Sequence, residues 1–178
     1  MSANASAGWP LQTTTDSAEA TRALAAALAG LCRAGDVVLL IGDLGTGKTV
    51  FAQGFAAALG VPGPVTSPTF ALVRQYRCGD DSPVGVLIHA DVYRTGSLDE
   101  VTDLALAELV EEDAVALVEW GELAAPALGD SALEITLVAP DPLGAPEQRA
   151  LTLVGRGRWA DRSDAVVALR QGAEGRIS

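Results

Sequence analysis

The stretch DVVLLIGDLGTGKTVFAQGFAAALG, residues 36–60, decides the fold of this 178-residue chain. Its first part, DVVLLIGD (36–43), is a run of valine, leucine and isoleucine without polar alternation. Such a run is typical of a strand that is buried on both faces of a sheet. Its last part, TVFAQGFAAALG (49–60), predicts a helix with Gly60 as its C-cap. A buried strand, a glycine-rich loop and a helix therefore follow one another directly.

The loop, GDLGTGKT (42–49), fits the P-loop pattern G-x-x-x-x-G-K-[ST]. Its glycines let the backbone turn N–H groups toward phosphate oxygens, and the following helix adds its N-terminal dipole. Lys48 would reach the β- and γ-phosphates, and the Thr49 hydroxyl would ligate Mg²⁺. The pattern therefore predicts a site for ATP or ADP with Mg²⁺. The predicted nucleotide-binding residues of the loop are Gly42, Asp43, Leu44, Gly45, Thr46, Gly47, Lys48 and Thr49.

Lys48 is the only lysine of the sequence, and every other basic residue is an arginine. The planar fork of arginine is too large for a pocket shaped for a compact ammonium group, so this position requires lysine. The N-K-x-D motif by which Ras-type GTPases read guanine is absent, because the only asparagine is Asn4. The sequence therefore favours ATP over GTP.

Strands and helices alternate around this centre, which predicts an α/β fold with a largely parallel sheet. We expect a P-loop domain over residues 13–157, a flexible tail over 1–12 and a C-terminal helix or tail over 158–178. A helix is expected from Asp16, as its N-cap, to about Cys32. A further helix is predicted at 97–113, strands at 70–76, 82–93 and 114–120, and an antiparallel pair at 132–140 and 149–155.

Two acidic residues end predicted strands: Asp91 follows VLIHA and Glu119 follows AVALV. A P-loop enzyme needs such an acid beside the loop to hold Mg²⁺, directly or through water. We therefore predict that Asp91 and Glu119 are catalytic and, with Thr49, bind the metal. Either carboxylate can instead be a strand-end group with a structural role. Trp120, next to Glu119, is also predicted to bind the nucleotide, and the alternative is burial in the core.

The segment TSPT (66–69) lies where many P-loop proteins sense the γ-phosphate through a hydroxyl. We predict Ser67 as a nucleotide contact and Thr69 as a catalytic residue; the alternative is a proline turn with capping hydroxyls. For His89, the only histidine, a packing role is favoured over a catalytic one, because it lies in mid-strand.

The net charge of −11 argues against a protein that grips nucleic acid unaided. The arginine-bearing segment 149–178 can contact an acidic partner or RNA, although a solvated face is favoured. The N-terminus lacks the features of a secretory signal and no apolar run is long enough for a bilayer, so we expect a cytoplasmic protein with no membrane contact. Cys32 and Cys78 have no metal-ligand spacing and are expected to be reduced thiols.

The segments GDLGTGKT, VTSPTFALVRQY, HADVYR and ALVEWGE, in this order and spacing, resemble the bacterial TsaE (YjeE) family. The resemblance covers about Thr14 to Val154, with small departures at Thr46, Val92 and Gly121 that should not block chemistry. It implies a P-loop α/β fold and a Mg-dependent ATPase that is slow alone.

The same resemblance implies roles for Lys48, Thr49, the S-P-T segment and the two acids that match those predicted above, and it marks Trp120 as a family position. It further implies a function in threonylcarbamoyladenosine formation next to the tRNA anticodon. TsaB-like and TsaD-like proteins would be the partners whose transfer complex is regulated or reset, with tRNA reached only through that complex. The alternatives are a P-loop small-molecule kinase and a nucleotide-sensing module without hydrolysis.

Overall fold

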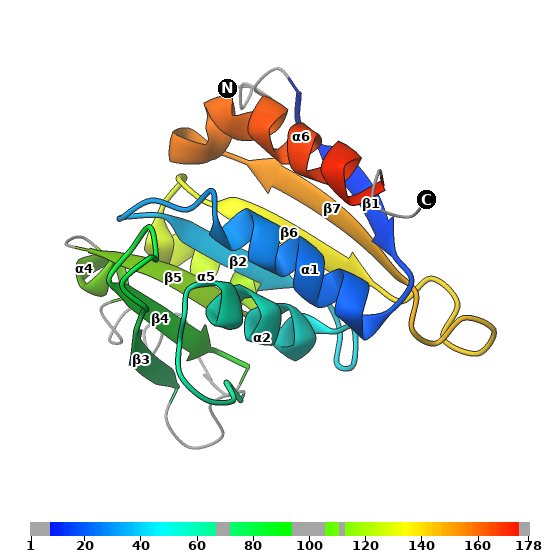
Figure 1. Cartoon of the computed structure of the whole chain (residues 1–178), viewed down its shortest axis with the longest axis horizontal. Helices are drawn as coiled ribbons and strands as arrows, with labels where there is room; N and C mark the ends of the chain where they lie inside the picture. Colours follow the sequence, from blue (N-terminus) through cyan, green and yellow to red (C-terminus); the bar gives the residue numbers. More distant parts are fainter. Residues whose placement is uncertain (1–7, 67–71, 94–105, 111–112, 175–178) are drawn as a thin grey trace.

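The computed structural model describes residues 8–66, 72–93, 106–110 and 113–174. Seven strands form one sheet in the order β1-β7-β6-β2-β5-β4-β3 (Figure 1). The central pairs β6–β2, β2–β5 and β5–β4 are parallel, whereas β1–β7, β7–β6 and β4–β3 are antiparallel. The predicted α/β fold, with a parallel centre and added antiparallel strands, is confirmed. The strands are β1 (Leu11–Thr15), β2 (Val37–Ile41), β3 (Val73–Arg77), β4 (Val86–Asp91), β5 (Ala114–Glu119), β6 (Leu133–Val138) and β7 (Arg149–Gly155).

Helices cover both faces of the sheet and create two apolar cores. On one face, α1 (Ala18–Ala29) and α2 (Lys48–Ala58) pack with Leu40 and Leu117 of the central strands. On the other face, α5 (Gly121–Leu128) packs with Leu39 and Val118 of the same strands. Because β2 and β5 bury both their faces, they carry the continuous apolar runs that the sequence shows. The short α4 (Leu106–Leu109) is the part of the helix predicted at 97–113 that lies within the described residues.

The first helix begins one residue later than expected. Ser17, not Asp16, is the N-cap of α1: its backbone is extended and its Oγ accepts a hydrogen bond from the Ala20 N–H at 3.2 Å. The helix ends at Ala29 rather than at Cys32, with Gly30 as C-cap. The Asp16 carboxylate instead accepts a hydrogen bond from the Ser17 hydroxyl.

Strand β1 was not predicted, and it starts within the stretch that we expect to be a flexible tail. It pairs only with β7, at the edge of the sheet, and its sequence LQTTT has no apolar alternation to mark it. Trp9 is also buried, and its Nε1 donates to the carbonyl of Ala160 at 3.0 Å. The packed part of the chain therefore begins before residue 13.

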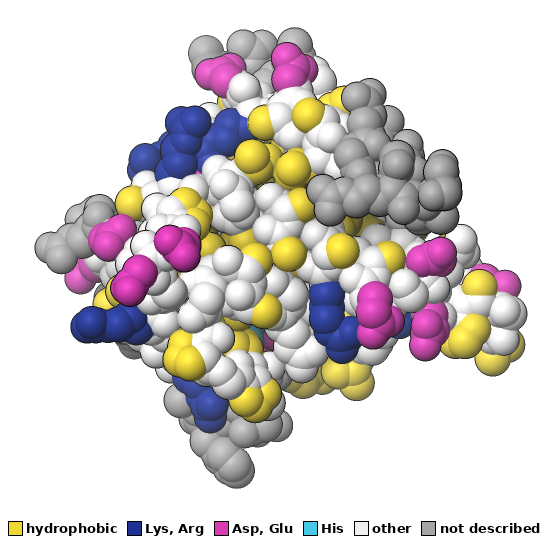
Figure 2. Space-filling model, viewed as in Figure 1, with side chains coloured by type: hydrophobic (Ala, Val, Ile, Leu, Met, Phe, Trp, Pro, Cys, Tyr) yellow, Lys and Arg dark blue, Asp and Glu magenta, His cyan; other side chains and the backbone are white. Residues whose placement is uncertain are grey.

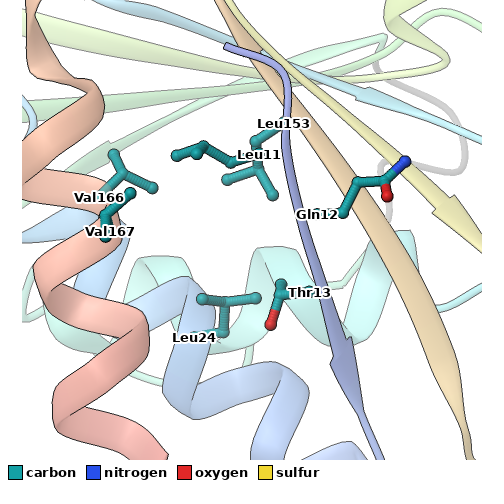
Figure 3. A pocket seen from close by; sticks show the side chains of 7 residues that line it. All are labelled: Leu11, Gln12, Thr13, Leu24, Leu153, Val166 and Val167. Carbon is teal, nitrogen blue, oxygen red and sulfur yellow. The ribbon is translucent and has the colours of Figure 1, made fainter. Parts of the chain in front are cut away.

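The C-terminal segment forms a 3₁₀ turn (Gly157–Arg162) and helix α6 (Ser163–Glu174), which packs beside α1 (Figure 1). Trp159 is fully buried in the apolar core on the face of the sheet that α1 and α2 cover. A small apolar cavity of about 20 Å³ remains between α6, α1 and the strands β1 and β7; Figure 3 shows its side chains, among them Leu11, Leu24 and Val166. Among the described residues, no helix is both long and apolar enough to cross a bilayer.

Candidate active site

The phosphate loop joins the end of β2 to the start of α2 and is closed by tight backbone contacts. Gly47, the N-cap of α2, has a φ of 99°, which other residues rarely adopt. A Cβ atom on Gly42 would collide with the carbonyl oxygen of Leu137 on β6. The Thr46 hydroxyl donates to the carbonyl oxygen of Asp43 at 2.8 Å. The loop is therefore compact, and its glycines are required by its geometry.

The Lys48 side chain is folded back inside this loop. Lys48 is only 5% exposed, and its Nζ donates to the carbonyl oxygens of Gly42 at 2.5 Å and Asp43 at 2.8 Å. Burial lowers the pKa of Lys48, whereas the carboxylates of Glu119, Glu122, Asp91 and Asp43 act in the opposite direction. The site thus holds one cation close to several carboxylates, an arrangement that suits an anionic ligand accompanied by a metal ion.

Glu119 links three elements of the site. Its Oε2 accepts a hydrogen bond from the Thr49 hydroxyl of α2 at 3.2 Å, and its Oε1 lies 2.9 Å from Nε2 of His89 on β4. The residue is 2% exposed. Asp91 is the direct neighbour of Glu119 in the β4–β5 register and accepts a hydrogen bond from the Tyr93 N–H at 3.0 Å. The two predicted acids and Thr49 are therefore brought together beside the loop.

His89 is fully buried, in agreement with the packing role that the sequence favoured. Its contact with Glu119 gives His89 a second role, the orientation of that side chain, which the sequence did not indicate. The contact is a buried hydrogen bond, in which the tautomer of the imidazole decides which of the two groups donates. His89 thereby fixes one oxygen of Glu119 and leaves the other toward Thr49.

Trp120 lies over the Lys48 ammonium group, with 3.9 Å between Nζ and the ring centroid. Among the described residues it is the only non-glycine with a positive φ, of 60°. The following Gly121 is so close to Leu39 of β2 that a side chain there would collide with it. This strained turn aims the indole back at the loop, where the Tyr93 ring packs on it at 4.5 Å between centroids. Trp120 therefore contacts Lys48 of the loop and also packs against the apolar core on the α5 side of the sheet.

Two residues near the loop were missed by the sequence reasoning. Tyr93 packs on Trp120, as described above. Arg149, which was counted with the basic C-terminal segment, begins β7, and its Nε donates to the carbonyl of Thr46 at 2.8 Å. No motif signals this contact, because the two residues are 103 positions apart and are joined only by the fold.

Two of the predicted loop residues, Asp43 and Leu44, have exposed side chains. The side chain of Leu44 is 83% exposed, so within the loop it contributes only its backbone, and Asp43 is also exposed. Ser67, Pro68 and Thr69 lie outside the described residues. A cavity of about 190 Å³ between α5, β2 and β6 shares no residue with the phosphate loop.

The donors beside Lys48 suit Mg²⁺. A hydroxyl from Thr49 and carboxylates from Glu119 and Asp91 are the hard oxygen ligands that this ion prefers. The described residues contain no cluster of three or more His, Cys, Asp or Glu side chains able to hold a metal. Mg²⁺ usually binds through one or two protein carboxylates, water and ligand phosphates.

Comparison with known proteins identifies similar chains. Residues 15–145 match the family model of the threonylcarbamoyl adenosine biosynthesis protein TsaE. A curated tRNA threonylcarbamoyladenosine biosynthesis protein TsaE from Streptomyces coelicolor is 42% identical, over 83% of this chain and 99% of that protein. The protein of the same name from Bacillus subtilis is 43% identical, over 67% of this chain and 72% of its own. The crystal structure of Bacillus subtilis YdiB superposes with a TM-score of 0.62 at 30% identity, over 95% of this chain and 97% of that one.

Proposed function

This chain belongs to the TsaE family, and from that premise we propose that it binds and hydrolyses ATP with Mg²⁺ in the biosynthesis of tRNA threonylcarbamoyladenosine. The biosynthetic role rests on the family match and on the names of its relatives. The ATPase activity rests on the arrangement of side chains around the phosphate loop.

The observation that carries the ATPase proposal is the link from Lys48 and Thr49 at the start of α2 to Glu119 at the end of β5. It combines a buried ammonium group, a hydroxyl and a carboxylate at one edge of the sheet. These are the three groups that a P-loop enzyme uses to hold phosphates and their metal.

In this mechanism Lys48 exchanges its bonds to the carbonyls of Gly42 and Asp43 for phosphate oxygens. Thr49 and the carboxylates of Glu119 and Asp91 would hold Mg²⁺, which neutralises phosphate charge when bound. His89 keeps the Glu119 carboxylate in one orientation, so that its free lone pairs can accept a proton from the attacking water. Trp120 and Tyr93 exclude solvent from the ammonium side of the loop.

We further propose that TsaB-like and TsaD-like proteins are the partners and that the ATPase regulates or resets their complex. Apolar side chains exposed at the sheet edge that carries the loop support a partner there: Leu44 is 83% exposed and Leu143, in the β6–β7 connection, 97%. Large apolar side chains with this exposure are typical of protein interfaces when they gather near a functional site.

The first test is nucleotide binding by calorimetry with Lys48→Ala as the variant. Loss of the ammonium contact should weaken ADP and Mg-ATP binding by at least ~1.5–3 kcal/mol, or roughly tenfold to a hundredfold. Arg33→Ala, at the opposite edge of the sheet, should bind as the unchanged protein does. Equal affinities of the Lys48→Ala variant and the unchanged protein would refute the nucleotide site.

A second arm tests the reaction and the pathway. ADP should form from ATP without any added acceptor, which a small-molecule kinase would not do at a comparable rate. In cells depleted of this protein, mass spectrometry should find less threonylcarbamoyladenosine in tRNA, restored by the unchanged gene but not by Lys48→Ala. Full modification after depletion would contradict the pathway, whatever the result for ATP.

A further inference from the structure

Arg149 binds the outside of the phosphate loop through backbone carbonyls. Its Nε donates to Thr46 at 2.8 Å and its Nη2 to Gly45 at 3.4 Å. On its other side, Nη1 donates to the carbonyls of Pro146 at 2.7 Å and Gln148 at 2.8 Å. One guanidinium group therefore fastens the loop to the connection between β6 and β7.

The direction of these bonds matters for the ligand. In a trans peptide the N–H of a residue points opposite to the preceding carbonyl. Because the Thr46 carbonyl faces Arg149, the N–H of Gly47 faces away from it. Phosphate is held in such loops by inward N–H groups, so a clamp on the Thr46 carbonyl fixes the orientation of the Gly47 N–H.

We propose that Arg149 is a positioning residue that holds the phosphate loop in its phosphate-binding form before any nucleotide arrives. The inference rests on the proposed nucleotide site and extends it. Arg149 lies beyond residues 15–145, which the family model matches. Preorganised donors avoid the cost of ordering the loop at the moment of binding, which should appear directly as affinity.

The chemistry of arginine explains why this residue type is present. Its planar group carries five N–H donors in a fixed fork, enough for the four carbonyl acceptors found here. A lysine at this position would keep the charge but would act as a point donor and could not span both segments. The arrangement of donors in the guanidinium group, rather than its charge alone, should therefore hold the loop in place.

The test compares Arg149→Gln and Arg149→Lys, with Arg156→Gln as the control. Arg156 follows the other end of β7, is half exposed and pairs only loosely with Glu134 at 3.5 Å. We expect Arg149→Gln to weaken ADP and Mg-ATP by the same factor, about tenfold or more. The affinity of Arg149→Lys for both nucleotides should fall nearly as much, and the affinity of Arg156→Gln should not change.

A second readout needs no nucleotide. Hydrogen–deuterium exchange at residues 45–48 of the free protein should be faster in Arg149→Gln than in the control, at temperatures where both are folded. If the unchanged protein binds no nucleotide, the proposed function fails, while faster exchange still supports the hold of Arg149 on the loop.

Three results would overturn the proposal. Unchanged affinity and exchange in Arg149→Gln would show that the clamp is dispensable. Nucleotide affinity and exchange in Arg149→Lys equal to those of the unchanged protein would show that a positive charge at this position is sufficient. A loss for Mg-ATP without a loss for ADP would indicate a direct contact to the γ-phosphate instead of positioning.

Discussion

Glu119 is the residue on which the local energetics of the site depend. It is buried, and its two oxygens are used by His89 and Thr49. A truncation to alanine would leave the buried ring nitrogen of His89 without its partner, at a cost of about 1–3 kcal/mol. We therefore expect Glu119→Ala to reduce stability as well as activity, so that a shape-preserving change is the better probe.

Glu119→Gln should keep the shape of the side chain and remove its charge. Hydrolysis at saturating ATP should fall by about 10²–10⁴-fold, the usual contribution of a general base, while the circular dichroism spectrum stays the same. Glu19→Gln, on the exposed surface of α1, serves as the control and should hydrolyse ATP at the normal rate. Unchanged hydrolysis in Glu119→Gln would mean that Glu119 neither activates water nor assists the metal, and Asp91→Asn would then be the next variant to measure.

The C-terminal segment is attached to the central sheet by a buried ion pair between Arg162 and Asp36. The Asp36 side chain, fully buried just before β2, accepts hydrogen bonds from Arg162 Nη1 at 2.5 Å and Nη2 at 3.2 Å. It also accepts from the Arg33 N–H at 2.8 Å. The Arg162 group packs on the Trp159 ring. These contacts attach the 3₁₀ turn and α6 to the beginning of the central strand.

Removal of the Arg162 side chain should therefore lower the stability of the protein considerably. Arg162→Met leaves the Asp36 carboxylate buried without its cation, and the free energy of unfolding measured in urea should fall by about 3–5 kcal/mol. Arg158→Met is the matched control, because its side chain is 55% exposed and its Nε lies 3.9 Å from Asp36. The free energy of unfolding of that variant should fall by less than about 1 kcal/mol.

Nucleotide affinity should stay the same in both variants wherever they are folded, because Asp36 precedes β2 and the phosphate loop follows it. Equal stabilities of the two variants would contradict the importance of this buried pair.

At the scale of the whole molecule, the C-terminal edge of the parallel strands carries both the site and an exposed apolar side chain on a projecting connection. The β6–β7 connection extends from the body of the protein on the right of Figure 1, and apolar side chains gather at its tip in Figure 2. Leu143 of this connection is 97% exposed. A partner that docks there would lie next to the loop that Arg149 fastens to the same connection.

Leu143→Ser should accordingly weaken binding to a TsaB–TsaD-like pair, about tenfold for a central apolar contact, as measured by surface plasmon resonance with Mg-ATP. Binding of ATP to the isolated protein should not change. Leu123→Ser, on α5 and 43% exposed, is the control and should bind the pair normally. If both variants bind the partner pair as tightly as the unchanged protein, the β6–β7 connection is not part of the interface.

The loop at residues 42–49, the central strands and the ends of those strands could be predicted from the sequence alone. The pattern at residues 42–49 has few backbone solutions, and strands buried on both faces need continuous apolar runs, as in β2 and β5. The acids Asp91 and Glu119 could be placed beside the loop because each directly follows such a run. These are local signals, in which neighbouring residues carry all the information.

Only the tertiary structure decided the contacts between distant segments. The Arg149 clamp, the His89 bond to Glu119 and the burial of Asp36 against Arg162 each join residues far apart in the chain. Strand β1 likewise depends on pairing with β7, because LQTTT has threonines that suit a strand but no apolar alternation to mark one. Such contacts depend on which side chains the sheet brings together, and no spacing along the chain encodes that meeting.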